Sequence, residues 1–365
     1  MTRASVPIPT PPRAEIFSEN LRRHLRDRCL SQRAAADEIA VPYKWLRRLC
    51  HHGLDRMDRR STANLERLTA FLGVASESLW EVTPIRTDPP KRDWVLIKWT
   101  GSKRLQASKI LEHFPSEIAT YYEPFLGGGA VLQQLLNSDI DVKRFRCSDV
   151  CRPLIEIWNL VKDDPRQLLR SYEMMWGEMQ KGGHDYYYQV RESFNRSGDP
   201  CEFFFLLRTC RNGLVRFNRR GQQFTAAHHH GRVGIAPEKI GPVIAHWHEQ
   251  LSGRDIRFSV GSYEEIRTRR NDFMYLDPPY VQRKGARYWG RIDYDQFFRW
   301  LGGQRARYVL SLNGFVGDKD CRVDVPGWHF DEHMQVEAGL RQARDESGQH
   351  VALRVTDSLY VRQEQ

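Results

Sequence analysis

Short β-rich runs alternate with helical patterns over most of this 365-residue chain. The runs are IATYYE, FRCSDV, IRFSV, DFMYLD and RYVLSL, and helical patterns such as RPLIEIWNLV lie between them. Because strands that alternate with helices form a sheet covered by helices, the pattern predicts an α/β fold. The β-rich runs disappear between Pro153 and about Ser252, which indicates a helical insert in the sheet domain.

A Pro-rich stretch, TPIRTDPPKRD, interrupts the helical pattern that precedes the sheet. Its prolines and charges cannot continue a helix, so it indicates a linker between two domains. The Pro-rich N-terminal residues indicate a flexible lead-in. The predicted order is a lead-in (1–14), a small helical domain (15–82), a linker (83–93), the sheet domain (94–152 and 253–365) and its insert (153–252).

The composition favours a folded protein with a polyanionic partner. Hydrophobic residues make up 40% of the chain, with 17 Phe, 14 Tyr and 10 Trp, which argues against disorder. The formal net charge of +10 suits nucleic acid but does not prove it. No apolar run is long enough to span a membrane, and MTRASVPIPTPPR lacks the apolar centre of a secretory signal. We therefore expect a cytoplasmic protein that associates with the nucleoid.

Seven cysteines are scattered along the chain without a CxxC pair or the spacing of a zinc site. Such thiols are expected to stay reduced and to be buried as small apolar side chains. The run His228-His229-His230 could suggest a metal, but adjacent residues of one loop do not easily converge on one ion. We predict no metal site and expect this loop to be polar and to face DNA.

The segment LSQRAAADEIAVPYKWLRRL has the pattern of two short helices joined by a tight turn. Ser31 is placed to cap the first helix, and Pro42 suits the first turn of the second. A further amphipathic helix is predicted from Thr62 to Leu72, where Gly73 ends it. The apolar positions of the two short helices are Ala35, Ile39, Val41, Leu46 and Leu49.

Together these helices resemble the all-α repressor-type helix-turn-helix family over roughly residues 15 to 80. In that family the second helix enters the major groove, which would present Tyr43, Lys44, Arg47 and Arg48 to DNA. The segment HHGLDRMDRR departs from the short loop usual after that helix. A helical bundle that binds protein, or only packs, is the alternative.

The run FMYLDPPY, residues 273–280, carries the strongest chemical signal. A strand that ends in Asp277-Pro278-Pro279-Tyr280 places a carboxylate at the edge of the sheet where α/β folds bind ligands. Proline has no amide N–H, so the turn offers only acceptors. An exocyclic amine donates to the Asp277 carboxylate and the Pro278 carbonyl, its lone pair faces an electrophilic methyl group, and Tyr280 stacks on the base. A simple turn at a strand end is the alternative.

The run YYEPFLGGGAVLQQLL indicates a strand, a Gly-rich turn and a helix. Gly127, Gly128 and Gly129 allow the backbone to approach a ligand, and Glu123 at the strand end is placed to meet a cationic amine. The following strand ends in Asp149, an acid of the kind that binds ribose hydroxyls. Asp149 could instead cap the helix that starts near Arg152.

Six segments follow one another along the chain in the order LIKWTGSKRLQASKI, EPFLGGG, SDV, RNGLVRFNRRGQQF, VGSYEEI and LDPPY. The Dam-like adenine-N6 DNA methyltransferases (D12 class, alpha group) have the same order, and the chain resembles them from about residue 95 to 312. The resemblance implies a Rossmann-like sheet domain that uses S-adenosylmethionine, with residues 153–252 as a target-recognition insert. It implies methyl transfer to adenine flipped out of duplex DNA. The implied cofactor contacts are Trp99, Lys103, Glu123, Phe125, Gly127, Gly129, Asp149, Ser262 and Tyr263.

Several of these residues also have a purely structural interpretation. Trp99 suits ordinary core packing, Lys103 suits a solvated surface, and Ser262 and Tyr263 suit a turn between a strand and a helix. The resemblance favours the functional interpretation of each.

The segment NGLVRFN resembles the hairpin that enters the DNA groove in this family. Lys98 aligns with the residue that reads the first base in GATC-specific relatives, but FTAAHHHG stands where such members tend to carry an FNVPFG-like stretch. A GATC site and related sites therefore both stay open. Lys98 is implied to contact a base, and Asn212, Leu214 and Arg216 are implied either to contact base pairs or to fill the gap left by the flipped base. The implied phosphate contacts are Arg211, Arg219, Arg220 and Arg232.

Two other classes of function are compatible with parts of the sequence. A transcriptional regulator with an inactive or partner-dependent methyltransferase domain would bind DNA without turnover, although the residues that the chemistry needs are retained. Amine methylation on cytosine, RNA or a protein glutamine would share the proline-rich turn, but Asp277 and the NGLVRFN segment favour adenine in DNA. A restriction enzyme or another defence component is a candidate partner, and the oligomeric state is open.

Overall fold

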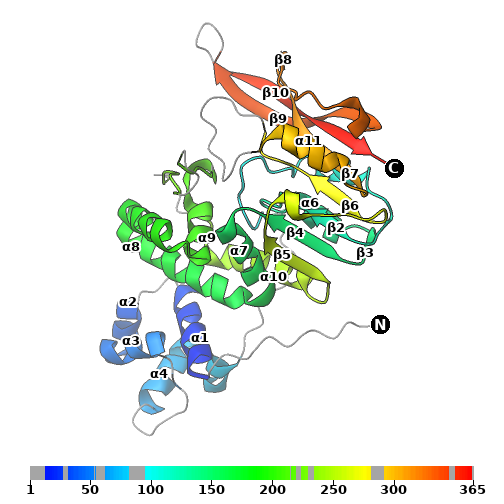
Figure 1. Cartoon of the computed structure of the whole chain (residues 1–365). Coiled ribbons are helices and arrows are strands. Elements are labelled where there is room, and N and C mark those ends of the chain that lie inside the picture. Colours follow the sequence, from blue (N-terminus) through cyan, green and yellow to red (C-terminus); the bar gives the residue numbers. More distant parts are fainter. Residues whose placement is uncertain are drawn as a thin grey trace. The chain divides into compact units, whose positions relative to one another are not determined.

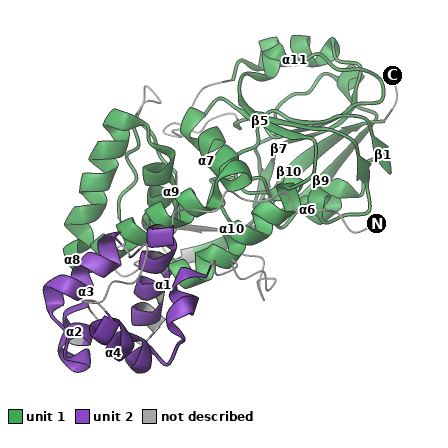
Figure 2. Ribbon diagram, turned by 90° about the horizontal axis from the view of Figure 1, so that it is seen from below, with its two compact units in different colours: residues 1–5, 86–365 green, residues 6–85 purple. Residues whose placement is uncertain are grey.

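The computed structural model in Figure 1 describes residues 13–27, 32–52, 54, 62–81, 95–213, 215–218, 223–228, 234–280, 292–344 and 350–363. The chain divides into two compact units, one of residues 6–85 and one that holds residues 86–365 (Figure 2). Within the described residues, no helix is both long and apolar enough to cross a membrane.

The smaller unit is a bundle of short helices around one apolar core. Every apolar position predicted for the two short helices is buried there. Ala40, between the two helices, adopts a left-handed conformation (φ +56°), and the Val41 amide donates to the Ala36 carbonyl at 3.0 Å, which closes the turn. Ser31 lies outside the described residues. The elements are α1 (Arg13–Asp27), α2 (Gln32–Ile39), α3 (Tyr43–His52), α4 (Thr62–Leu72) and the 3-10 helix η1 (Ser76–Trp80).

The prediction for the last α-helix of this bundle is confirmed at both ends. Helix α4 begins at Thr62 and ends at Leu72, and Gly73 follows with a φ of +61°. A left-handed residue directly after a helix is the position that glycine occupies at low cost.

The larger unit is built on a mixed sheet with the strand order β5-β4-β2-β6-β7-β10-β9, in which β8 also pairs with β7. Neighbours from β5 to β7 run parallel, whereas β10 and β9 are antiparallel to their neighbours. The predicted α/β fold is therefore confirmed. The strands are β1 (Glu117–Ile118), β2 (Tyr121–Glu123), β3 (Asp141–Val142), β4 (Phe145–Asp149), β5 (Ile256–Val260), β6 (Phe273–Leu276), β7 (Arg307–Val316), β8 (Lys319–Asp320), β9 (Glu332–Arg344) and β10 (His350–Arg362).

Between β4 and β5 the chain leaves the sheet and forms a group of helices, drawn in green beside the β5 edge in Figure 1. Helix α9 lies at the centre of this group, and its residues 203–207 are fully buried. Its core is continuous with the core of the sheet. The helices are α7 (Arg152–Asp163), α8 (Pro165–Ser197), which bends at Gly183, α9 (Pro200–Thr209) and α10 (Pro237–Leu251).

The C-terminal hairpin of β9 and β10 was not predicted, because the last β-rich run recognised in the sequence is RYVLSL. In the first part of β9, polar residues alternate with Met334, Val336 and Ala338, and Met334 and Val336 lie half-buried against the core. The remaining helices are α5 (Ala107–Leu111), α6 (Ala130–Leu136) and α11 (Tyr294–Gly302), with short 3-10 turns η2 (Arg211–Gly213), η3 (Tyr263–Glu265) and η4 (Gly327–His329).

The cysteines of the described residues are free thiols, as the sequence predicts. Cys321 is half-buried, Cys29 lies outside the described residues, and the buried thiols are Cys50, Cys147, Cys151, Cys201 and Cys210.

Candidate active site

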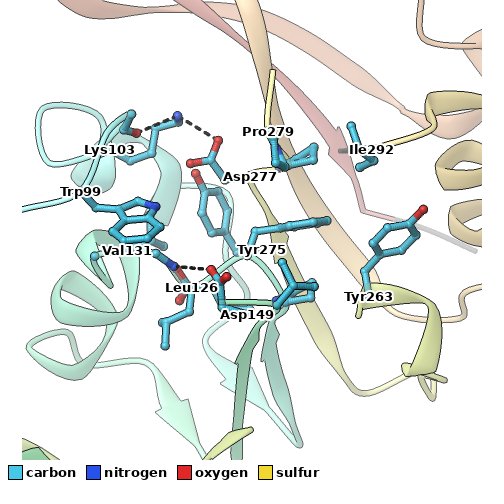
Figure 3. Close-up of a pocket in the computed structure, with 18 of the residues that line it drawn as sticks. Trp99, Lys103, Leu126, Val131, Asp149, Tyr263, Tyr275, Asp277, Pro279 and Ile292 are labelled. Carbon is cyan, nitrogen blue, oxygen red and sulfur yellow. Dashed lines mark hydrogen bonds and ion pairs between the residues drawn. The ribbon is translucent and has the colours of Figure 1, made fainter. Parts of the chain in front are cut away.

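A cavity of about 530 Å³ opens at the carboxyl ends of the parallel strands. Glu123 ends β2, Asp149 ends β4, Ser262 follows β5 and Asp277 follows β6, and all four line this cavity. Because parallel strands end at the same edge of the sheet, segments far apart in the sequence meet here. Figure 3 shows Asp149, Tyr275 and Asp277 arranged around this space.

The Gly-rich turn lies against two tryptophans without room for side chains. A Cβ added at Gly127 (φ +48°) would lie 2.7 Å from Trp99 Cδ1, and one at Gly129 (φ +64°) would lie 2.7 Å from Trp158 Cζ2. The Trp158 indole donates to the Gly127 carbonyl at 3.1 Å. Glycine is thus required by conformation and by space, and the turn exposes bare backbone to the cavity.

Asp149 holds this turn in place while it lines the cavity. Its Oδ2 accepts from the Gly127 amide at 3.1 Å, and its Oδ1 accepts from the Cys151 amide at 2.9 Å, directly before α7. The N-cap of α7 is Cys151 and has no side-chain cap bond, so Asp149 does not cap this helix, whereas its place in the cavity wall is as the ligand interpretation requires. Burial raises the pKa of Asp149 to about 6, although hydrogen bonds from the backbone oppose the rise.

Glu123 is the most deeply buried acid of the cavity wall, at 2% exposure. The Tyr121 hydroxyl donates to its Oε2 at 2.8 Å. Burial raises the pKa of Glu123 to about 8, the hydrogen bond from Tyr121 opposes the rise, and the charge of Asp277 adds to it. In the free protein this carboxyl group is therefore mostly protonated at neutral pH.

Lys103 and Asp277 form a buried ion pair, visible in Figure 3, with 2.9 Å between Nζ and Oδ1. The Lys103 side chain is only 5% exposed, so a solvated surface lysine is excluded. Burial alone would lower the pKa of Lys103, but the charges of Asp277 and Asp357 outweigh burial and raise it. Burial raises the pKa of Asp277 to about 6, and Lys103 limits the rise.

Tyr280 packs beside this ion pair. The Lys103 ammonium lies 4.6 Å from the centroid of the Tyr280 ring, within the range of a cation–π interaction. The carbonyl of Pro279 accepts from the Tyr294 hydroxyl at 3.0 Å, which ties the turn to the start of α11. The Pro-Pro turn is thus fixed by the Lys103 contacts of Asp277 and Tyr280 and by the Tyr294 hydrogen bond to Pro279. Both prolines, Pro278 and Pro279, line the cavity.

Ser262 and Tyr263 form a turn after β5 as well as part of the cavity wall. Ser262 and Glu265 make reciprocal capping bonds around η3. The Tyr263 ring packs against Phe125, with ring centroids 5.6 Å apart, and against Trp300 at 5.0 Å. These residues therefore take part in local packing and also line the cavity, and Trp99 likewise packs on the core while it lines the cavity.

The segment that resembles the family's DNA-entering hairpin lies beside Lys98. A Cβ added at Gly213 (φ +65°) would lie 2.9 Å from Lys98 Cδ, and the Val215 amide donates to Thr100 Oγ1 at 3.2 Å. Lys98 and Arg216 are both exposed. The candidates Leu214, Arg219, Arg220 and Arg232, together with the side chain of Asn212, lie outside the described residues.

The expectation for His228 was wrong. It was predicted in a polar loop that faces DNA, but it is 6% exposed and stacks on Tyr187, with ring centroids 4.9 Å apart. Its Nδ1 lies 3.0 Å from Nδ1 of His184, and a β-bridge with Cys210 draws it into the core. His229 and His230 lie outside the described residues.

In the smaller unit, α3 presents its basic side chains outward. Lys44, Arg47 and Arg48 are exposed, while Tyr43 is half-buried and lies 5.2 Å below the guanidinium of Arg33.

Sequence reasoning missed part of the cavity wall and one buried carboxylate. Asp293 is the N-cap of α11. An aspartate directly before the helical pattern YDQFFRWL is a recognisable N-cap signal, so this residue could have been found from the sequence. No local pattern marks the others. Among the missed residues are Tyr275, Ile292, Asp293 and Gln296 in the wall, and Asp357 with Gln106 behind Lys103.

Residues 99–295 match the family model of the D12 class N6 adenine-specific DNA methyltransferases. The chain is 28% identical over 244 residues to the type II methyltransferase M.MjaIII of Methanocaldococcus jannaschii, which covers 59% of this chain and 82% of the relative. It is 30% identical over 197 residues to the DNA adenine methylase of Escherichia coli (strain K12), which covers 52% of this chain and 66% of the relative. Similarity to the solved structure of an rRNA methyltransferase from Streptomyces viridochromogenes is low, with a TM-score of 0.31, 13% identity and coverage of 76% of this chain and 88% of that one.

Proposed function

This chain belongs to the D12 class N6 adenine-specific DNA methyltransferases, and from that premise we propose that the cavity described above is its catalytic site. The enzyme uses S-adenosylmethionine and acts on adenine in DNA. The observation that carries the assignment is the Asp277-Pro278-Pro279-Tyr280 turn, which lies in the same cavity as the Gly-rich turn.

The cavity fits a ligand that carries positive charge, a ribose and an aromatic base. Its wall holds the acids Glu123, Asp149 and Asp277, and its Gly-rich turn has no side chain to obstruct a close approach. S-adenosylmethionine, when bound, supplies an electrophilic methyl group. We assign Asp149 to the ribose hydroxyls and Glu123 to the amino group of the ligand.

The other wall residues have supporting roles in this proposal. Trp99, Phe125, Ser262 and Tyr263 form the sides against which the cofactor packs. Lys103 lines the cavity, but its ammonium contacts Asp277 and Asp357. We therefore propose that Lys103 acts as the charge partner of the Asp277 carboxylate rather than as a contact of the cofactor.

The chemistry at the amine depends on acceptors alone. Asp277 and the carbonyl of Pro278 accept the two N–H bonds of the adenine amine, and the prolines offer no competing donor. The nitrogen lone pair is then directed away from both acceptors. Positioning and electrostatics of this kind lower the barrier without a strong base. The adenine must leave the base stack to bring its amine to the Asp277-Pro278 turn in the cavity wall.

Target recognition is assigned to Lys98 and the segment 211–218 beside it, with the helix-turn-helix unit as a second DNA-binding surface. Lys98 and Arg216 are exposed near the same turn, as donors to base edges need to be. The site read is GATC or a related sequence. The partner that we propose for an enzyme of this function is a cognate restriction enzyme.

Cofactor binding should release protons at neutral pH. Glu123 is mostly protonated in the free protein because its pKa is about 8, and a bound cation beside it lowers that pKa. Affinity for S-adenosylmethionine should therefore rise as the pH rises from 7 to 8, with the release of up to about one proton at pH 7. Calorimetry in buffers of different ionisation enthalpy measures this release. Glu123→Gln should remove it, and equal release from both proteins would refute the assignment.

The basic face of α3 should contribute to DNA affinity through phosphates. Changing Lys44, Arg47 and Arg48 together to alanine should reduce the slope of log K against log salt by about 0.9 for each phosphate that the variant no longer neutralises. Methyl transfer on saturating short duplexes should be unchanged. A matched control removes three exposed cations of the larger unit, Lys109, Lys181 and Arg196. If both variants give the same salt slope, the helix-turn-helix assignment fails.

The function itself is tested in a host that lacks adenine methylation. DNA from cells that express the chain should contain N6-methyladenine in one sequence motif, read by methylation-sensitive single-molecule sequencing. The motif found decides between GATC and a related site. Complete absence of modification would favour a DNA-binding regulator instead.

A further inference from the structure

A second buried carboxylate, Asp357, lies behind the catalytic turn. It belongs to β10, outside the segment 99–295 that matches the family model, and it is 5% exposed. Its Oδ2 lies 3.5 Å from Lys103 Nζ, while Oδ1 of Asp277 lies 2.9 Å from the same nitrogen. One ammonium group is thus shared unequally between two carboxylates.

Gln106 fixes the position of Asp357. Its side-chain amide donates to the same Asp357 Oδ2 at 2.7 Å, and Gln106 is itself 2% exposed. The backbone of Gln106 also donates to the Lys103 carbonyl at 3.0 Å. One short turn therefore presents both the ammonium and the amide to Asp357.

An irregularity in β10 brings Asp357 to this point. The register between β10 and β7 shifts between Val355 and Asp357, and the register between β10 and β9 shifts between Val355 and Thr356. The Thr356 hydroxyl accepts from the Phe315 amide at 2.9 Å, in place of a regular ladder bond. Such bulges redirect side chains next to active sites.

We propose that Asp357 is a positioning residue for methyl transfer: held by Gln106, it shares the Lys103 ammonium and so keeps acceptor capacity free on Asp277 for the adenine amine. A lysine with one carboxylate partner concentrates its charge there and competes with the amine for the same oxygens. A second carboxylate divides that attraction. The inference rests on the proposed catalytic role of Asp277.

The charges around Asp277 affect its pKa, so the effect of Asp357 can be measured as a shift in the pH profile of activity. The titratable groups that act with it are Lys103 from the loop before α5, Asp357 from β10, Glu123 from β2, Tyr275 from β6 and Tyr280 from the turn. Burial raises the pKa of Asp277, Lys103 lowers it, and Asp357 raises it. Loss of the Asp357 charge should therefore move the acid limb of kcat/KM for DNA to lower pH.

Two variants should move this limb in opposite directions. Asp357→Asn leaves Lys103 with Asp277 alone, so we expect kcat to fall about 10- to 100-fold and the acid limb to move to lower pH. Gln106→Met leaves Asp357 without its donor, so Asp357 draws Lys103 from Asp277, and the limb moves to higher pH. Asp357→Glu should recover part of the loss in kcat. Affinity for S-adenosylmethionine should stay within about twofold of wild type, because none of these groups is assigned to the cofactor.

Asp320→Asn is the matched control, since Asp320 is an exposed aspartate on β8 of the same sheet. If Asp357→Asn does not fold, Gln106→Met carries the test by itself. Unchanged kcat in folded Asp357→Asn, or an acid limb of kcat/KM that does not move in a folded variant, would overturn the proposal. Methylation by the wild-type chain in the same assay reports separately on the proposed function.

Discussion

Replacing Asp277 with alanine should abolish adenine methylation, with a loss of about 10³-fold or more in kcat. The variant removes the carboxylate that accepts the amine, and no other side chain assigned to the amine can replace it. Binding of S-adenosylmethionine, measured by calorimetry, should be largely retained. Lys103 keeps Asp357 as a partner, so the fold should also be retained.

Asp295→Ala is a suitable control for this variant because Asp295 is exposed on α11. It should methylate at the wild-type rate. Normal methylation by Asp277→Ala would show that the amine is accepted elsewhere and that the catalytic site is wrongly assigned.

Replacing Lys103 with methionine should lower kcat about 100-fold at neutral pH. Asp277 and Asp357 would then be buried together without their cation, and the pKa of Asp277 would rise above its present value of about 6. A protonated Asp277 offers less acceptor capacity to the amine. The acid limb of the pH profile should move to higher pH, so that part of the activity returns as the pH is raised.

The same variant should show a pH dependence of stability with a definite sign. An acid with a raised pKa in the folded state loses stability as the pH rises from its unfolded value, about 4, to its folded value. Tm of Lys103→Met should therefore fall relative to wild type as the pH rises. Lys109→Met, at an exposed position of α5, should behave as wild type in both respects. Full activity of Lys103→Met with an unmoved acid limb would show that Lys103 does not control Asp277.

The fold and the two turns of the cavity wall could be predicted because their signals are local. The β-rich runs, the Gly-rich turn and the Asp-Pro-Pro-Tyr turn are each contained in a few consecutive residues. Parallel strands bring their carboxyl ends together, so Glu123, Asp149 and Asp277 were expected at one edge and line one cavity.

The charge network behind Asp277 could not be predicted, because it depends on contacts between distant segments. Gln106 and Asp357 are 251 positions apart, and the bulge that orients Asp357 follows from strand pairing, which no local pattern in β10 announces. The prediction that His228 lies in an exposed polar loop was wrong for the same reason. A run of three histidines looks polar in sequence, but a β-bridge to Cys210 decides that the first of them is buried.

The helices that depart from the sheet after β4 return at β5, and these two strands are direct neighbours in parallel register, from Phe145 beside Ile256 to Asp149 beside Val260. A segment that joins two neighbouring strands of a fixed sheet can change in length and composition without altering the distance between the strands that carry the cavity. If the insert recognises DNA as proposed, sequence recognition and methyl transfer can therefore evolve at different rates within one domain. On the proposed assignment, a new target site would require changes in the insert and at Lys98, while the residues at the sheet edge stay the same.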